Sequence, residues 1–200
     1  MTNAASIKER LTRPWHHGEY EDLSGIVCDE PLDLSGLALC GVDFSGAHFK
    51  GPVNLTGTHL RGVSWFNGAV FEATLGLDGS QFDNDARFEN VHFKADVMAR
   101  DAEFRGVARF DNARFDGVCD FSRLVSYGNF ALENAYFSQD ARFSGAEFMG
   151  GLWCDHCNLT DQADFSSAQV HGRLWLRDAR HRDRGLEAEA FDLAFGYVYA

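Results

Sequence analysis

The sequence predicts an all-β solenoid, in which very short strands wind into a stack of coils. The first observation is an apolar column: fifteen of the eighteen phenylalanines follow a spacing that alternates five and six residues. The second is that a small side chain stands two residues before most of these positions, and glycine or asparagine often stands two residues after them. A short period repeated along most of a chain means that each unit buries its apolar side by stacking on its neighbours.

Each unit is expected to be a short strand followed by a tight corner. In the unit from Ala113 to Gly117, Ala113 and Phe115 point inward and Arg114 points to solvent, because side chains alternate along a strand. Gly117 marks the corner, since glycine and asparagine tolerate positive φ. A helix does not fit, because spacings of five and six residues do not keep to one face of it. The predicted core column contains Phe66, Phe71, Phe82, Phe88, Phe93, Phe104, Phe110, Phe115, Phe121, Phe137, Phe143, Phe148 and Phe165.

The units resemble those of the pentapeptide-repeat proteins. Ala47-His48-Phe49-Lys50-Gly51 and Ala146-Glu147-Phe148-Met149-Gly150 carry the pattern plainly, in a Phe-rich form with alternating five- and six-residue units. The resemblance covers about three quarters of the chain and implies a right-handed quadrilateral β-helix. Two five-residue and two six-residue units then make one four-sided coil.

Three parts are expected along the chain: an N-terminal cap over residues 1–22, the pentapeptide-repeat β-helix over 23–177, and a C-terminal amphipathic helix or tail over 178–200. Ser6 to Glu9 has the spacing of a capping box and predicts the start of a short N-terminal helix that Pro14 ends. Such parts would cover the unpaired backbone at the ends of the stack.

The expected C-terminal helix has an apolar stripe with helical spacing. The stripe consists of Leu186, Ala190, Leu193, Ala194 and Tyr197. A lone helix of this length is marginally stable in water, so the stripe must dock on something. It either caps the last coil or joins two copies of the chain in a homodimer.

Three tryptophans are expected to share one outer column. Trp65, Trp153 and Trp175 each stand directly before a core position, and whole numbers of coils separate them: four between Trp65 and Trp153, and one between Trp153 and Trp175. With Tyr136 on an adjoining face, they predict an aromatic contact surface. Trp153 has an alternative: it turns inward to replace Cys154, which is small for a core position.

Composition limits the classes of function. The net charge of −12 argues against direct contact with nucleic acid, because phosphate contacts need a basic surface. The sequence has no apolar run long enough to span a membrane and no signal-peptide region, so a cytoplasmic protein is expected. The five cysteines are odd in number and stand mostly at inward positions, which predicts reduced thiols.

No cofactor, metal site or catalytic set is expected. Cys154, His156 and Cys157 have the residue types of a zinc site, but the two cysteines fall on inward positions and His156 at an outward corner. Asp120, Glu147 and Asp164 stand among charges of both signs. A carbohydrate-active β-helix enzyme is therefore only a remote alternative.

The sequence thus predicts a non-catalytic, rigid scaffold that binds a protein partner. The resemblance adds an alternative, because some pentapeptide-repeat proteins mimic B-form DNA, dimerise through a C-terminal element, bind DNA gyrase and protect it from quinolone-type inhibitors. A type II topoisomerase is therefore a candidate partner. The net charge and the tail agree with this alternative, whereas the arginines interleaved with the acidic residues do not.

Overall fold

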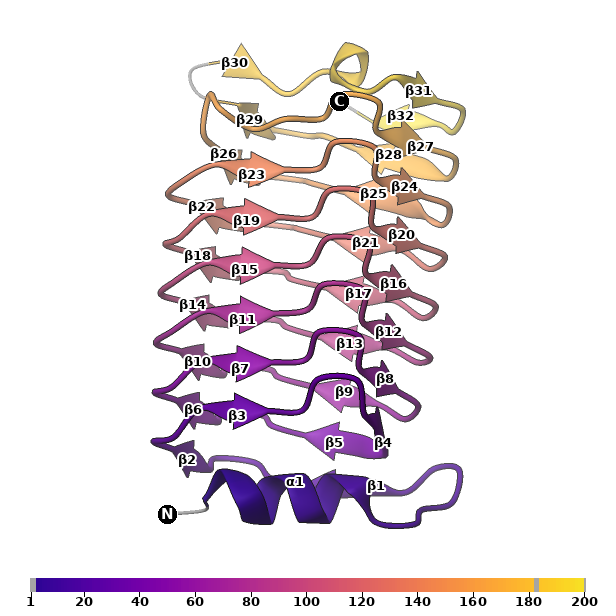
Figure 1. The fold of residues 1–200 in the computed structure, drawn as a ribbon. Helices are drawn as coiled ribbons and strands as arrows, with labels where there is room; N and C mark the ends of the chain where they lie inside the picture. The colour runs from indigo at the N-terminus through magenta and orange to yellow at the C-terminus, as the bar shows by residue number, and fades with distance from the viewer. Residues whose placement is uncertain (1–2, 182–183, 200) are drawn as a thin grey trace.

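A computed structural model describes residues 3–181 and 184–199 of the chain. One helix, α1 (Ala4–Thr12), lies across the N-terminal end of a stack of coils, and the C-terminal residues lie at the other end (Figure 1). The described strands of the coils are each two or three residues long and alternate with tight turns, as the repeat predicts. A right-handed, four-sided β-solenoid of about eight turns results.

The strands stack into four sheets, one for each side of the coil. Sheet A contains β1 (Tyr20–Asp22), β5 (Gly41–Asp43), β9 (Ser64–Trp65), β13 (Ala86–Arg87), β17 (Ala108–Arg109), β21 (Phe130–Ala131), β25 (Gly151–Trp153), β28 (Arg173–Trp175) and β32 (Val198–Tyr199). Sheet B contains β2 (Val27–Cys28), β6 (His48–Phe49), β10 (Val70–Phe71), β14 (His92–Phe93), β18 (Arg114–Phe115), β22 (Tyr136–Phe137), β26 (Asn158–Leu159), β29 (Arg180–His181) and β30 (Arg184–Gly185).

The other two sheets are shorter. Sheet C contains β3 (Leu32–Asp33), β7 (Val53–Asn54), β11 (Leu75–Gly76), β15 (Val97–Met98), β19 (Cys119–Asp120) and β23 (Ala141–Arg142). Sheet D contains β4 (Ala38–Leu39), β8 (His59–Leu60), β12 (Gln81–Phe82), β16 (Glu103–Phe104), β20 (Val125–Ser126), β24 (Glu147–Phe148), β27 (Gln169–Val170) and β31 (Leu193–Ala194).

Strand pairing follows the coil length that the repeat predicts. Arg87 pairs with Arg109 in sheet A, and Phe93 pairs with Phe115 in sheet B. These strands are parallel, as expected when successive coils run in the same direction; within the described residues, the antiparallel pair is β29 with β30 at the C-terminal end. Residues one coil apart therefore lie directly above one another through most of the solenoid.

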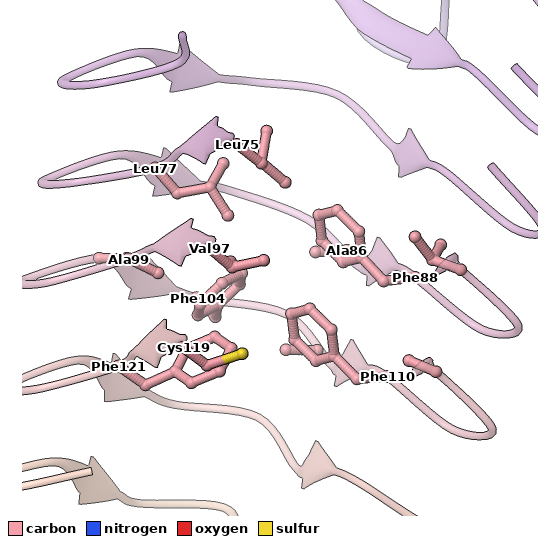
Figure 2. Packing of buried hydrophobic residues seen from close by; sticks show 14 of the residues in the cluster. Leu75, Leu77, Ala86, Phe88, Val97, Ala99, Phe104, Phe110, Cys119 and Phe121 are labelled. Carbon is pink, nitrogen blue, oxygen red and sulfur yellow. The ribbon is translucent and has the colours of Figure 1, made fainter. Parts of the chain in front are cut away.

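Phenylalanine rings stack along the centre of the solenoid (Figure 2). The ring of Phe88 lies 4.7 Å from that of Phe66 on one side and 4.7 Å from that of Phe110 on the other, with parallel planes. Every member of the predicted core column is buried. Burial of one such side chain stabilises the fold by roughly 1.5–3 kcal/mol, so these stacks are the main source of stability.

One large core residue, Phe130, lies outside the predicted core column. Phe130 occupies a position where most units carry a small residue, and it is fully buried. It packs against Phe104 and Phe110 on the coil below, with ring centres 5.9 and 5.3 Å away. The nearby column position holds Ser126, whose hydroxyl donates to the carbonyl of Gly128. Phe130 therefore fills the volume that the small Ser126 leaves.

The corners are of two kinds, whereas the sequence predicted one. At Gly46 the backbone has a φ of +65°, the left-handed conformation that glycine tolerates. Gly51 has no positive φ, but a Cβ atom there would lie 2.6 Å from the backbone of Glu30 and Pro31 on the coil below. Glycine is therefore needed at the second kind of corner for close stacking of backbones rather than for φ.

The N-terminal helix closes one end of the core. Ile7 and Leu11 of α1 are fully buried. Asn3 is the N-cap, and its side-chain oxygen accepts a hydrogen bond from the backbone N–H of Ser6 at 2.8 Å. The helix thus begins earlier than the capping box at Ser6 predicted, because Asn3 is also a strong N-cap residue.

The C-terminal amphipathic helix that the sequence predicted does not form. Leu193–Ala194 is instead strand β31 beside β27, and Val198–Tyr199 is β32 beside β28. A short 3-10 helix, η1 (Ala188–Ala190), precedes them. The last complete coil presents unpaired backbone N–H and C=O groups, and pairing with these outweighs a weak helical pattern.

Candidate functional site

The outer column of sheet A carries the three tryptophans. Above Asp22 and Asp43, the column contains Trp65, Arg87, Arg109, Ala131, Trp153 and Trp175, one residue for each coil, and Tyr199 follows in the tail. We call this set the sheet A column. Two arginines and an alanine separate the first tryptophan from the other two, so the aromatic side chains form two separate groups.

Trp153 points outward, which resolves the alternative that the sequence left open. The residues on either side of it in the chain, Leu152 and Cys154, are both fully buried. Because side chains alternate along a strand, Trp153 lies on the outer face, where it is half-buried. Cys154 keeps its place in the core in spite of its small size.

Trp153, Trp175 and Tyr199 form an aromatic stack at the C-terminal end. The ring centres of the two tryptophans are 6.0 Å apart, and Tyr199 lies flat against Trp175 at 4.3 Å. The Nε1 atoms of both tryptophans are buried and have no hydrogen-bond acceptor among the described residues. Trp65 is far from this stack along the column and contacts Tyr20 at the N-terminal end, with ring centres 5.3 Å apart.

Tyr136 lies on the adjoining sheet B and is 44% exposed. Its ring lies beneath the guanidinium of Arg114, 5.5 Å from the ring centre. Within the described residues it makes no ring contact with Trp153 or Trp175. The structure therefore pairs Tyr136 with Arg114 rather than with the tryptophans.

The tail places the predicted stripe residues in different environments. Leu186 is buried, Ala190 packs partly buried against the core, and Tyr197 is exposed. The side chains of Leu193 and Ala194 lie outside the part of the structure that is described. Phe191 is also buried, with its ring 4.9 Å from that of Phe165, so the tail covers the end of the core.

Two further aromatic residues of the tail, which the helical spacing did not indicate, face solvent. Phe195 is 71% exposed and Tyr199 is 41% exposed. Tyr199 pairs with Trp175 but stands further along the chain from it than one regular coil, because the last coil is longer. Continuing the regular coil spacing past Trp175 would have indicated that the tail adds a further strand to sheet A. It would not have identified Tyr199 as the residue that pairs with Trp175.

A column of acidic residues runs beside the sheet A column, two residues further along each coil. It contains Glu89, Asp111, Glu133 and Asp155, with Arg177 above them. We call this set the acidic column. Backbone hydrogen bonds between successive coils hold these positions one above another, for example from the N–H of Asn112 to the carbonyl of Glu133.

Arginines of the sheet A column neutralise the lower part of the acidic column. Arg87 Nη1 lies 3.0 Å from Glu89 Oε1, and Arg109 Nε lies 2.7 Å from Asp111 Oδ2. On the next coil the sheet A column holds Ala131, and the Glu133 carboxylate has no ion pair among the described residues. The pairing that the lower coils repeat is thus interrupted at this coil.

A cavity of about 150 Å³ opens where the pairing stops. Glu133, Trp153, Asp155 and Trp175 line it. The carboxylate of Asp155 already has partners: it accepts a hydrogen bond from the backbone N–H of Arg177 at 3.0 Å and forms an ion pair with the guanidinium of Arg177 at 3.3 Å. The cavity therefore combines two indole rings with one carboxylate, that of Glu133, which has no partner in the described structure.

The cysteines lie in the core. Cys154 and Cys157 are fully buried and form no disulfide, whereas His156 is at an exposed corner with a φ of 56°. A hydrogen bond with Cys157, together with burial, raises the pKa of the Cys154 thiol well above its usual range. Among residues 3–181 and 184–199, no group of three His, Cys, Asp or Glu side chains is placed to hold a metal ion.

The carboxylates considered for catalysis are dispersed. Asp120 is on sheet C, where its carboxylate lies 3.9 Å from the guanidinium of Arg142. Asp164 bridges to the backbone of Arg142 one coil further on, and Glu147 is on sheet D.

No described helix is long and apolar enough to cross a membrane.

The four-sided coil with its buried phenylalanine column defines a β-solenoid repeat protein. A sequence model of the family described as pentapeptide repeats (9 copies) matches residues 41–81 and 77–125. Residues 41–125 thus consist of pentapeptide repeats, as the sequence predicted.

Comparison with solved structures gives a distant similarity. The structure of a trypsin-treated variant of QnrB1, a plasmid-mediated fluoroquinolone resistance protein, is 18% identical to this chain. The match covers 88% of this chain and 89% of that chain, with a TM-score of 0.31. No curated protein is significantly similar to this chain in sequence.

Proposed function

We propose that this protein is a rigid, non-catalytic scaffold that binds a protein partner through the aromatic surface at its C-terminal end. We call this surface the C-terminal aromatic surface and define it as Trp153, Trp175, Phe195, Tyr197 and Tyr199. The pentapeptide-repeat fold supports the scaffold, because tight corners join most of its described strands, whereas catalytic sites are normally built on longer loops.

One observation carries the proposal: exposed apolar side chains concentrate at this end of the solenoid. Phe195, Tyr197, Val198 and Tyr199 are each at least 41% exposed, within five consecutive residues. Solvent-exposed aromatic clusters are typical of contact surfaces, where tyrosine and tryptophan contribute much of the binding energy. In the described middle of the solenoid, by contrast, exposed aromatics stand singly, as Tyr127 does.

Affinity capture with matched variants tests the proposal. The tagged protein is incubated with lysate of its own organism, and captured proteins are quantified by mass spectrometry. We expect a specific partner that is lost with the double variant Trp175→Ser and Tyr197→Ser, because the variant removes two of the five aromatic side chains of the surface, including the most exposed one, Tyr197. The partner should be retained with Tyr127→Ser, which removes an exposed aromatic elsewhere. Equal capture by both variants would contradict the proposed surface.

The partner in this proposal can also be a second copy of the chain. β32 is the last strand of sheet A, and Val198 on it is 42% exposed, so its free edge and apolar side chain are available for pairing across a two-fold axis. Light scattering distinguishes the two cases. A mass of twice 22.3 kDa at micromolar concentration is expected for the homodimer, and a monomer would leave only a different protein as partner.

A second candidate function is binding to a type II topoisomerase by imitation of DNA. The net charge of −12 supports this candidate, whereas the arginines that neutralise the acidic column on the middle coils weaken it. A supercoiling assay with purified DNA gyrase tests it directly. Inhibition, or protection from a quinolone, at micromolar protein is the expected result, and no effect of either kind would reject this candidate.

A further inference from the structure

The cavity beside Glu133 has the chemistry of a site for an organic cation. Indole faces attract guanidinium and ammonium groups, most strongly when water is excluded. A carboxylate at the same cavity supplies the ion pair, and for guanidinium two parallel hydrogen bonds as well. Trp153, Trp175 and Glu133 provide these groups on three successive coils of the same side of the solenoid.

The lower coils show which cation fits the pattern. Arg87 and Arg109 each place a guanidinium against the acidic residue two positions further along the same coil. The next coil has the acid, Glu133, but Ala131 supplies no cation, since its side chain is a methyl group. The solenoid therefore lacks one arginine at the point where the cavity opens.

The size of the cavity limits the ligand. At about 150 Å³ it matches cavities that admit one benzene-sized molecule, and it is below the range of sites for drug-sized ligands. A single guanidinium group fits such a volume. The net charge of the lining groups is also suitable, because Arg177 compensates Asp155 and leaves one negative charge, that of Glu133.

We propose that this cavity binds an exposed arginine side chain of the protein partner. The inference builds on the proposed function and names the anchor by which the partner is recognised. A protein ligand suits the site better than a free cation, because both tryptophans of the cavity belong to the C-terminal aromatic surface, whose exposed side chains can contact the rest of a protein partner. Arginine is preferred over lysine, since the planar guanidinium stacks on aromatic faces.

Calorimetric titration with short peptides tests the inference. The probes are Gly-Arg-Gly with blocked ends and the same peptide with citrulline, a neutral group of almost the same shape. We expect saturable binding of the arginine peptide, weakened by salt because the ion pair is partly exposed. The citrulline peptide should bind at least tenfold more weakly. Equal binding of both peptides, or no binding at millimolar concentration, would overturn the inference.

Two variants locate the binding in the cavity. Glu133→Gln removes the charge with little change of shape, and Ala131→Arg supplies the missing arginine from the chain itself. Each should reduce the affinity for the arginine peptide at least tenfold. Glu147→Gln on sheet D is the matched control and should bind as the unmodified protein does. Circular dichroism and thermal unfolding establish that the variants are folded; unchanged binding by folded Glu133→Gln would overturn the inference.

Two further measurements separate this inference from the proposed function. Methylguanidinium binding as tightly as the arginine peptide would assign the cavity to a free cation and overturn the protein anchor. If the peptide does not bind but capture of a partner still depends on Trp175, the surface stands and only the arginine anchor fails. If capture is lost with Ala131→Arg and with Glu133→Gln, the anchor operates in the complex.

Discussion

The middle coils, residues 64–129, and the last coils, residues 150–199, differ both inside and outside. Inside, the middle coils hold continuous stacks of phenylalanines, whereas the last coils hold mostly smaller residues beside Phe165 and Phe191, namely Leu152, Cys154, Leu159 and Val170. Outside, the sheet A column carries paired arginines on the middle coils and an aromatic stack on the last coils. The middle coils thus satisfy their own interactions, whereas the last coils leave aromatic area, and Glu133 on the coil below them leaves a carboxylate, for another molecule.

Among the variants that compare the two regions, replacement of a stacked phenylalanine in the middle coils should cause the largest loss of unfolding free energy. Phe110→Ala removes a fully buried ring with parallel neighbours, and we expect a loss of roughly 3–5 kcal/mol in unfolding free energy. Cys154→Ala in the last coils removes one atom and should cost only about 1 kcal/mol, similar to one buried methylene. Denaturant unfolding of both variants measures the difference; equal losses would mean that the two cores are packed alike.

Removal of an arginine should reduce stability on the middle coils but not on the last coils. Arg109→Ala leaves Asp111, which is only 5% exposed, without its ion pair, so we expect a loss of about 1 kcal/mol. Arg173 on the last coils has no ion pair within the described residues, and Arg173→Ala should leave the unfolding midpoint unchanged. The prediction is wrong if Arg173→Ala costs as much as Arg109→Ala.

Acid should weaken the middle coils through Asp116. A hydrogen bond from His92 at 2.6 Å lowers the pKa of Asp116, followed in effect by the charge of Arg114. The carboxylate therefore contributes stability above its ordinary pKa of about 3.9, and this is lost as pH falls through the lowered pKa. We expect Asp116→Asn to lose less stability than the unmodified protein between pH 5 and pH 2.

Thermal unfolding across this pH range checks the effect of Asp116. The matched control is Glu147→Gln, an exposed carboxylate with no ion pair among the described residues. It should follow the unmodified protein at every pH. Parallel curves for Asp116→Asn and the unmodified protein would show that the ion pair with His92 does not contribute.

A glycine substitution at a corner of the last coils should have a small effect on stability. Ser167 is exposed and has a φ of 56°, a conformation that costs a non-glycine residue about 1–2 kcal/mol. Ser167→Gly relieves this strain but increases the entropy of the unfolded chain by about 0.5–1 kcal/mol. We expect a net stabilisation of about 0.5 kcal/mol by these two terms, seen as a higher unfolding midpoint. A lower midpoint would mean that the corner is not strained.

Much of the fold could be predicted from the sequence, because period and register follow from local alternation of inward and outward side chains. The coil length places Trp153 above Ala131 and below Trp175, and the structure has this order. The sequence pattern did not predict where a large residue on one coil makes up for a small core residue on another. Phe130 fills the space beside Ser126, which depends on packing between units rather than on the pattern within one.

The C-terminal end was predicted least well. The stripe from Leu186 to Tyr197 has helical spacing, but the free backbone of the last coil pairs with the tail and makes strands of it. The aromatic surface at that end could be anticipated from Trp153 and Trp175. The unpaired state of Glu133 could not, because it depends on which side chains of neighbouring coils meet.

Nuclear magnetic resonance of the indole N–H groups tests the difference between the two regions most directly. Each tryptophan side chain gives one signal, so Trp65 serves as an internal control for Trp153 and Trp175. During titration with the blocked Gly-Arg-Gly peptide, we expect saturable shifts of the Trp153 and Trp175 signals and none of the Trp65 signal. Shifts of equal size at Trp65, or no shift at Trp153 and Trp175, would contradict the assignment of binding to the last coils.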